Sequence, residues 1–121
     1  MSRRGIEREL LTVTVAANRT GKLFVDIAGA PIGTAGIDAF GVLRDTLLSG
    51  EVGDVAIFDA GNTAMVTVGT GGLTKGDKVM SDATGKAVLA TTGKVILGTA
   101  LETAVATVDA EILLTKGGGV V

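Results

Sequence analysis

The sequence predicts a mainly β protein, namely a small β-barrel or β-sandwich with an extended amino-terminal arm and at most one short helix. Short apolar or alternating segments follow one another at a spacing of roughly ten residues, which is typical of small barrels and sandwiches. Glycine-containing turns separate these segments, and the chain has 19 glycines among 121 residues. Strands rich in alanine, valine and threonine make a thin core. Such a fold would gain stability by packing against copies of itself or a larger partner.

Alternation of apolar and polar residues, or a short apolar run, predicts each strand. In chain order, strands are expected at residues 10–17, 22–28, 54–59, 64–69, 77–81, 86–91, 94–102 and 110–115. Pro31 lies in a loop or edge segment, where its missing N–H does no harm. Residues 82–85 are expected to form a tight turn between two strands, because aspartate and glycine both favour turns.

The segment 36–51 has apolar residues at helical spacing, although Gly41 would cost a helix about 1 kcal/mol relative to alanine. A shift of the chain by 57 residues places residues 36–57 over residues 93–114 without a gap, and the second copy is much more strand-like. The shift superposes Gly36 on Gly93, Phe40 on Leu97, Gly41 on Gly98, Asp45 on Glu102, Thr46 on Thr103, Asp54 on Glu111, Val55 on Ile112 and Ile57 on Leu114. Both copies are therefore interpreted as strand, loop and strand, with a short helical turn allowed near residues 43–48.

The net charge of −2 is unevenly distributed along the chain. Residues 1–22 hold five basic and two acidic residues, whereas residues 23–121 hold six basic and eleven acidic residues. We therefore predict a basic amino-terminal arm over residues 1–22, which merges into the first strand. A single β-domain with a weak internal repeat is predicted over residues 23–121. A solvated terminus that contacts nothing explains the same charge pattern equally well.

The composition removes the parts that most catalytic and metal sites need. Cysteine, histidine, tyrosine and tryptophan are all absent, so a thiolate, an imidazole base and the commonest transition-metal ligand are missing. We predict no enzymatic activity, no metal and no cofactor. The amino terminus lacks the pattern of a signal peptide, and the longest charge-free stretch, residues 60–74, is too short and polar to span a bilayer. The chain is expected to be soluble and made in a cytoplasm.

Lys86 is the first candidate for a functional side chain, because lipoyl and biotinyl domains present a lysine at a hairpin turn. Those domains carry family-specific neighbours, typically aspartate or methionine before the lysine, whereas Gly85 precedes Lys86 here. A solvated lysine near a turn is the more frequent meaning of this pattern. A small carrier or ligand-binding β-domain that uses Lys86 or a glycine loop remains the alternative function.

Two further patterns suggest a phosphate-binding or carboxylate site, but their residue spacing does not match the known motifs. The loop 69–76 is rich in glycine and contains Lys75, but it leads into a strand and lacks the Gly-Lys-Ser/Thr order of a phosphate loop. Asp54, Asp59, Asp77 and Asp82 could in principle form an acid–base or Ca²⁺ site, yet no calcium-loop spacing is present. Asp77 and Asp82 are expected to stabilise turns through hydrogen bonds to the nearby main chain. An acidic body with three phenylalanines also does not favour specific nucleic-acid binding.

Three segments in order resemble the capsid decoration (head cement) proteins of tailed bacteriophages. They are residues 41–66, beginning "GVLRDTLL", residues 71–88, which contain "LTKGDKV", and residues 96–114, which contain "ILGTALETA". The second matches an I-x-x-G-D-x-V element of that family and the third a G-x-A-L-E-x-A element. The resemblance runs from about residue 33 to residue 116, or about two-thirds of the chain.

The resemblance implies a β-body that forms a homotrimer on the outer surface of an icosahedral head and bridges copies of the major capsid protein. It also implies that an amino-terminal arm contacts the shell. The candidate contact residues are Arg3, Arg4, Ile6 and Arg8. The expected location is therefore the surface of a virion, with no cofactor, no membrane and no specific nucleic acid as a partner.

Overall fold

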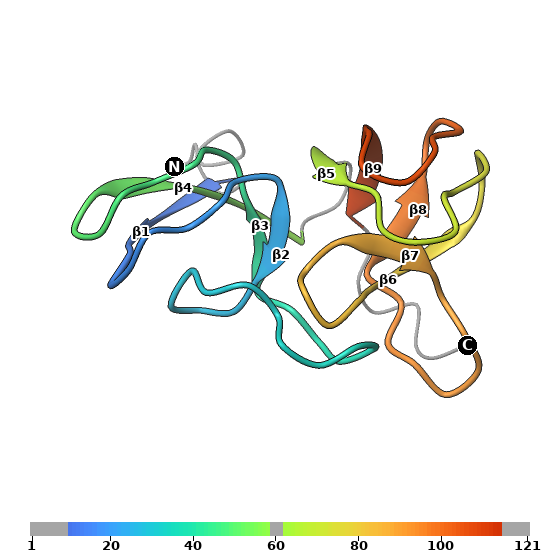
Figure 1. The fold of residues 1–121 in the computed structure, drawn as a ribbon, viewed down its shortest axis with the longest axis horizontal. Helices are drawn as coiled ribbons and strands as arrows, with labels where there is room; N and C mark the ends of the chain where they lie inside the picture. The colour runs from blue at the N-terminus through green and yellow to red at the C-terminus, as the bar shows by residue number, and fades with distance from the viewer. Residues whose placement is uncertain (1–9, 59–61, 115–121) are drawn as a thin grey trace, which may run out of the picture.

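The computed structural model describes residues 10–58 and 62–114, and these residues form nine β-strands in two antiparallel sheets. The first sheet contains β1 (Leu10–Thr14), β2 (Leu23–Val25), β3 (Gly41–Leu43) and β4 (Val52–Ile57), in the order β1-β4-β3-β2. The second contains β5 (Thr63–Thr67), β6 (Lys78–Ser81), β7 (Ala87–Leu89), β8 (Gly98–Ala100) and β9 (Asp109–Leu114), in the order β5-β9-β8-β6-β7. Figure 1 shows the two sheets side by side.

The prediction of a mainly β fold is confirmed, and its sandwich form fits better than a closed barrel, because each sheet keeps two free edges. The helical turn allowed near residues 43–48 is not formed, since no described residue is helical. Residues 10–22 of the predicted arm form β1 and the connection to β2. The rest of that arm, residues 1–9, lies outside the described residues. The division into an arm and a single β-domain stays a prediction.

The β6–β7 hairpin forms where the turn was predicted. Val79 pairs with Leu89 and Ser81 with Ala87 in antiparallel register. The Asp82 carboxylate closes the turn between them, because its Oδ1 accepts the main-chain N–H of Thr84 at 2.8 Å and of Lys86 at 2.9 Å. This is the local hydrogen bonding for which aspartate is favoured in turns.

The strand pair β3–β4 recurs 57 residues later as β8–β9 with the same register. Gly41 lies opposite Ile57 in the first pair, and Gly98 lies opposite Leu114 in the second. Both glycines need to lack a side chain. A Cβ on Gly41 would overlap the carbonyl oxygen of Ala56, and a Cβ on Gly98 would overlap that of Leu113. The two sheets thus use glycine at the same place to bring neighbouring backbones together.

The correspondence extends to the outer strands of the two sheets. β1 pairs with β4 as β5 pairs with β9, and β2 pairs with β3 as β6 pairs with β8. The order β1-β4-β3-β2 therefore matches β5-β9-β8-β6, and β7 is an addition at the edge of the second sheet. We call residues 10–58 the first half and residues 62–114 the second half.

The main core lies between the two sheets. Phe24 and Val42 from the first sheet are fully buried in one cluster with Ile112 and Leu114 from the second. The Phe24 ring stacks on Phe58, with ring centroids 6.4 Å apart. Full burial of a side chain of this size stabilises the fold by about 1.5–3 kcal/mol, so the interface between the halves contributes substantially to stability.

A smaller cluster lies on the opposite face of the first sheet. Successive strand residues point to opposite faces, and accordingly Val25 and Leu43 belong to this cluster whereas their neighbours Phe24 and Val42 belong to the main core. Its buried members are Val15, Val25, Leu43, Leu47 and Val55. The first sheet is therefore packed on both faces, which explains the continuous apolar run of β2.

Candidate functional site

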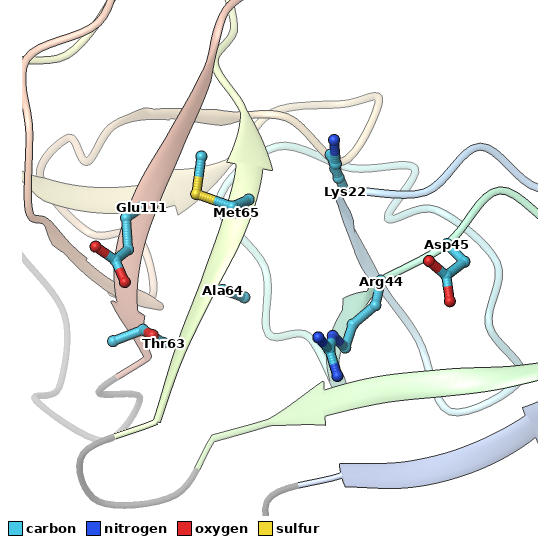
Figure 2. Close-up of a pocket in the computed structure, with 7 residues that line it drawn as sticks. All are labelled: Lys22, Arg44, Asp45, Thr63, Ala64, Met65 and Glu111. Atoms are coloured by element: carbon cyan, nitrogen blue, oxygen red, sulfur yellow. The ribbon is translucent and has the colours of Figure 1, made fainter.

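An open cleft lies where the two halves meet. One pocket of about 310 Å³ is lined by Lys22, Arg44 and Asp45 from the first half and by Thr63, Met65 and Glu111 from the second. Figure 2 shows these two groups on opposite sides of the pocket. A neighbouring pocket of about 370 Å³ shares Lys22, Arg44 and Asp45 and extends the cleft to Thr67 and Asp109. The cleft is thus a charged groove between the halves.

Lys22 joins the two halves through its main chain and its side chain. Its backbone is left-handed, with φ of 63°. In this conformation its N–H donates to the carbonyl oxygen of Leu43 at 2.6 Å, and its own carbonyl oxygen accepts the N–H of Thr67 at 2.9 Å. The Lys22 Nζ lies 3.1 Å from Oδ2 of Asp109. Lys22 of the first half therefore contacts the second half twice, through its carbonyl oxygen at Thr67 and through its side chain at Asp109.

Asp109 is held in its charged form by these neighbours. The hydroxyl of Thr67 donates to Oδ1 of Asp109 at 2.8 Å. This hydrogen bond, together with the hydrogen bond and charge of Lys22, lowers the pKa of Asp109 below its ordinary value, although partial burial acts in the opposite direction. Asp109 and Lys22 are thus a structural pair that closes one end of the cleft.

Arg44 and Glu111 lie in the same cleft and do not pair with each other. Neither side chain makes an ion pair with another described residue, and both are exposed. Their main chains are fixed, because the N–H of Arg44 donates to the carbonyl oxygen of Asp54 at 3.1 Å and the N–H of Glu111 donates to Glu102 at 2.8 Å. The cleft therefore presents an exposed cation and an exposed carboxylate, neither of them paired with a residue of 10–58 or 62–114, to a polar partner.

Lys86 does not occupy the tip of its hairpin. Residues 83–85 form the tip, and Lys86 precedes β7 with its main chain bonded to Asp82 on both sides, at 2.9 Å through its N–H and 2.8 Å through its carbonyl oxygen. The residue is partly buried. An attached cofactor needs a lysine that projects from a tip, so this position favours the architectural interpretation of the turn.

The carboxylates singled out in the sequence do not gather into a site. Asp82 serves its turn, and Oδ2 of Asp77 accepts the N–H of Thr74 at 2.8 Å, as expected for turn residues. Asp54 lies on β4 in the other half, and Asp59 lies outside the described residues. Within residues 10–58 and 62–114, no cluster of three or more acidic residues could hold a metal ion.

The glycine-rich loop 69–76 leads into β6 rather than a helix, as the sequence indicated. With Leu89 and Val105 it lines a wide groove of about 560 Å³. Its backbone is shaped by left-handed glycines at positions 71, 72 and 76. The groove is a surface feature of the second half that sequence reasoning did not find.

The predicted arm residues Arg3, Arg4, Ile6 and Arg8 lie outside the described residues, so their role as contacts stays a prediction. Exposed aliphatic side chains were also missed by sequence reasoning. Leu48 and Val105 are prominent among them, and they are superposed by the same 57-residue shift that aligns Gly41 with Gly98. The 57-residue shift is the sequence signal from which the equivalence of Leu48 and Val105 could have been predicted. In the part of the chain that is described, no helix has the length and apolarity to cross a membrane.

No family model matches the chain, and no curated protein is similar enough in sequence to match it. Among solved structures, the fold is similar to that of the head fiber gp8.5 N base of bacteriophage phi29. The TM-score is 0.68 at 16% sequence identity, and the match covers 88% of this chain and 92% of the other. At this identity the likeness establishes a shared fold over nearly the whole length of both chains.

Proposed function

We propose that the protein is a structural component of a bacteriophage virion, bound to the outer surface of an icosahedral head between copies of the major capsid protein, which it stabilises. The observation that carries this proposal is the fold shared with the head fiber gp8.5 N base over 92% of that chain. The sequence elements at residues 73–79 and 96–104 resemble decoration proteins of phage heads. Sequence and fold therefore point independently to the same kind of particle.

The physical properties of the chain suit such a role. A cement protein acts by binding the assembled shell more tightly than the dissociated one, so its effect follows from mass action and buried area. Exposed aliphatic side chains, such as Leu48 and Val105, and the exposed charges of Arg44 and Glu111 provide surface for such contacts. None of these contacts requires a reacting group or a cofactor.

Purified protein mixed with heads that lack it tests the proposal. We expect saturable co-sedimentation with expanded heads and a rise in the temperature at which the heads release their DNA. Binding sites that saturate at a fixed ratio to the capsid protein would separate a specific position from coating. Failure to bind any head would contradict the proposal, and binding without a change in release temperature would contradict the stabilising role.

The self-association that we propose is a homotrimer, which would supply the additional burial that a thin core lacks. Light scattering on the free protein then gives a mass of about 36 kDa, from three chains of 12.0 kDa each. Concentration must be followed by refractive index, because the chain has no tyrosine or tryptophan. A mass of one chain in solution, and one chain per binding site on the head, would contradict the trimer.

A further inference from the structure

The β3–β4 and β8–β9 loops form two tips that share several equivalent hydrogen bonds, although Leu48 and Ser49 of the first make additional bonds to Glu51, Asn18 and Ala16. We call residues 46–51 the first tip and residues 103–108 the second tip. At the base of the first, the hydroxyl oxygen of Thr46 accepts the N–H of Gly21 at 3.1 Å. At the base of the second, the hydroxyl oxygen of Thr103 accepts the N–H of Lys75, also at 3.1 Å. Each tip is thus anchored to the strand connection beside it.

The next residue of each tip is fixed by a reciprocal pair of main-chain bonds. Leu47 exchanges two hydrogen bonds with Arg19, at 2.8 and 2.9 Å, and Ala104 exchanges two with Leu73, also at 2.8 and 2.9 Å. Leu47 and Ala104 are both buried. The residue that follows each of them is therefore presented from a fixed backbone.

The far side of each tip also has the same conformation. The N–H of Gly50 donates to the carbonyl oxygen of Val15, and the N–H of Thr107 donates to that of Val68, both at 2.8 Å. Both residues are left-handed, with φ of 87° at Gly50 and 74° at Thr107. A β-branched residue rarely adopts this conformation. The second tip thus keeps the shape of the first even where its sequence opposes that shape.

Each tip exposes an aliphatic side chain at the equivalent position, and the second tip also exposes Val108, whose counterpart in the first tip is Glu51. Leu48 is 60% exposed and Val105 is 69% exposed. A single exposed aliphatic residue is ordinary on a protein surface. Here an exposed aliphatic side chain recurs at the same position of two tips whose main chains are held by equivalent hydrogen bonds. In each tip the side chain lies outside the core. A partner with an apolar depression for one aliphatic side chain would bury it.

The two tips lie on different halves of the molecule. Figure 1 places the first tip, on the β3–β4 connection, at the left end, and the second tip, on the β8–β9 connection, at the upper edge of the right half. Two equal contact points at separate positions fit a partner surface that repeats the same site. An icosahedral shell is such a surface, because it displays many copies of one protein.

We propose that the protein bridges the head through these two tips, each of which inserts its aliphatic side chain into the same site on a different copy of the capsid-surface protein. This inference rests on the proposed function and specifies it. Each chain then makes two contacts, and its second contact forms at a high effective concentration once the first has formed. Loss of either tip removes one of the two contacts of every chain and lowers that gain.

Serine substitutions at the tips test the bridge by co-sedimentation with heads that lack the protein. We expect Leu48→Ser and Val105→Ser each to weaken binding by about 100-fold, since bivalence commonly exceeds single-site affinity by 10²–10⁴, and the double variant to lose binding. The matched control is Ile27→Ser, because Ile27 is 75% exposed and lies outside both tips. It should bind like the unsubstituted protein. Thermal unfolding of all four variants checks that they are folded.

A cross-linking experiment tests the equivalence of the two partner sites. The chain has no cysteine, so Leu48→Cys and Val105→Cys each introduce a unique position for a thiol-linked photo-cross-linker. Both variants, bound to heads, should cross-link to the same peptide of the capsid-surface protein. Cross-links to two different peptides would overturn the proposal of equivalent sites.

The outcomes separate this inference from the proposed function. If the unsubstituted protein does not bind heads, the proposed function itself fails. If it binds and both single serine variants bind equally well, or only one tip matters, the bridge is overturned while the proposed function stands. A loss in Ile27→Ser equal to that in the tip variants would also overturn the special role of the tips.

Discussion

The Nζ of Lys22 lies 3.1 Å from Oδ2 of Asp109, and this ion pair joins the two halves of similar strand order at one end of the cleft. The same lysine adopts a left-handed backbone and accepts the N–H of Thr67. Its counterpart in the second half is Gly76, whose N–H donates to Ala100 as that of Lys22 donates to Leu43. The left-handed backbone at this position favours glycine, which Gly76 provides in the second half. The first half has Lys22 there instead, and its side chain contacts Asp109 of the second half.

Asp109→Asn should lower stability near neutral pH by about 1 kcal/mol, since it removes one partly exposed ion pair and weakens the Thr67 hydrogen bond. The pKa of Asp109 is lowered in the folded protein. Its contribution to stability is therefore present above the unfolded-state pKa, about 3.9, and is lost as the pH falls through the lower folded-state pKa. Urea unfolding at pH 7 and at acidic pH measures both effects.

Asp45→Asn is the matched control for the acid effect, because Asp45 lines the same cleft and makes no ion pair with a described residue. The difference in stability between the unsubstituted protein and Asp109→Asn should shrink on acidification below a pH of about 3.9, whereas Asp45→Asn, which removes no ion pair between described residues, should change stability little at pH 7. A constant difference for Asp109→Asn at all pH values would contradict the role of its charge.

Gly98→Ala should destabilise the protein by about 1–3 kcal/mol, because the added methyl group meets backbone rather than a movable side chain. The obstructing atom is the carbonyl oxygen of Leu113 on the neighbouring strand. Gly33→Ala is the control, since a Cβ there meets no atom within 4 Å and its φ is not positive. Chemical denaturation compares the two. Equal stabilities would show that the close approach of β8 and β9 is not required.

Thr107→Gly should stabilise the protein by about 0.5–1 kcal/mol, because glycine adopts a positive φ without steric cost, partly offset by its larger entropy when unfolded. The reciprocal change, Gly50→Thr, places a β-branched residue at the equivalent left-handed position and should destabilise by about 1 kcal/mol. The midpoint of thermal unfolding measures both. Destabilisation by Thr107→Gly would mean that the Thr107 side chain makes a compensating contact.

The strands could be predicted from the sequence because each one depends on a local pattern. Alternation of side chains marked β5, and the short segment between Lys78 and Leu89 had aspartate and glycine where a hairpin must reverse. The alignment of Gly41 with Gly98 was also visible, since close backbone contact leaves no alternative to glycine. These features are set by neighbours along the chain or by an absolute steric limit.

The outer strands of the two halves share no readable sequence signal. Leu11 opposite Val55 corresponds to Ala64 opposite Ile112, but many residue types satisfy an edge strand, so no pattern links β1 to β5. The helical spacing at residues 37–48 was likewise uninformative, because burial on both faces of the first sheet places apolar residues at several spacings.

The sequence by itself determined the β class, the turns at Asp77 and Asp82 and the absence of the residue types on which most catalytic sites depend. Only the tertiary structure decided that the strands divide into two sheets, that Lys22 meets Asp109 across the cleft, and that Leu48 and Val105 stand on equivalent frames. Turns and strand periodicity depend on residues a few positions apart. Contacts between residues more than 50 positions apart depend on how whole sheets pack, which local pattern does not encode.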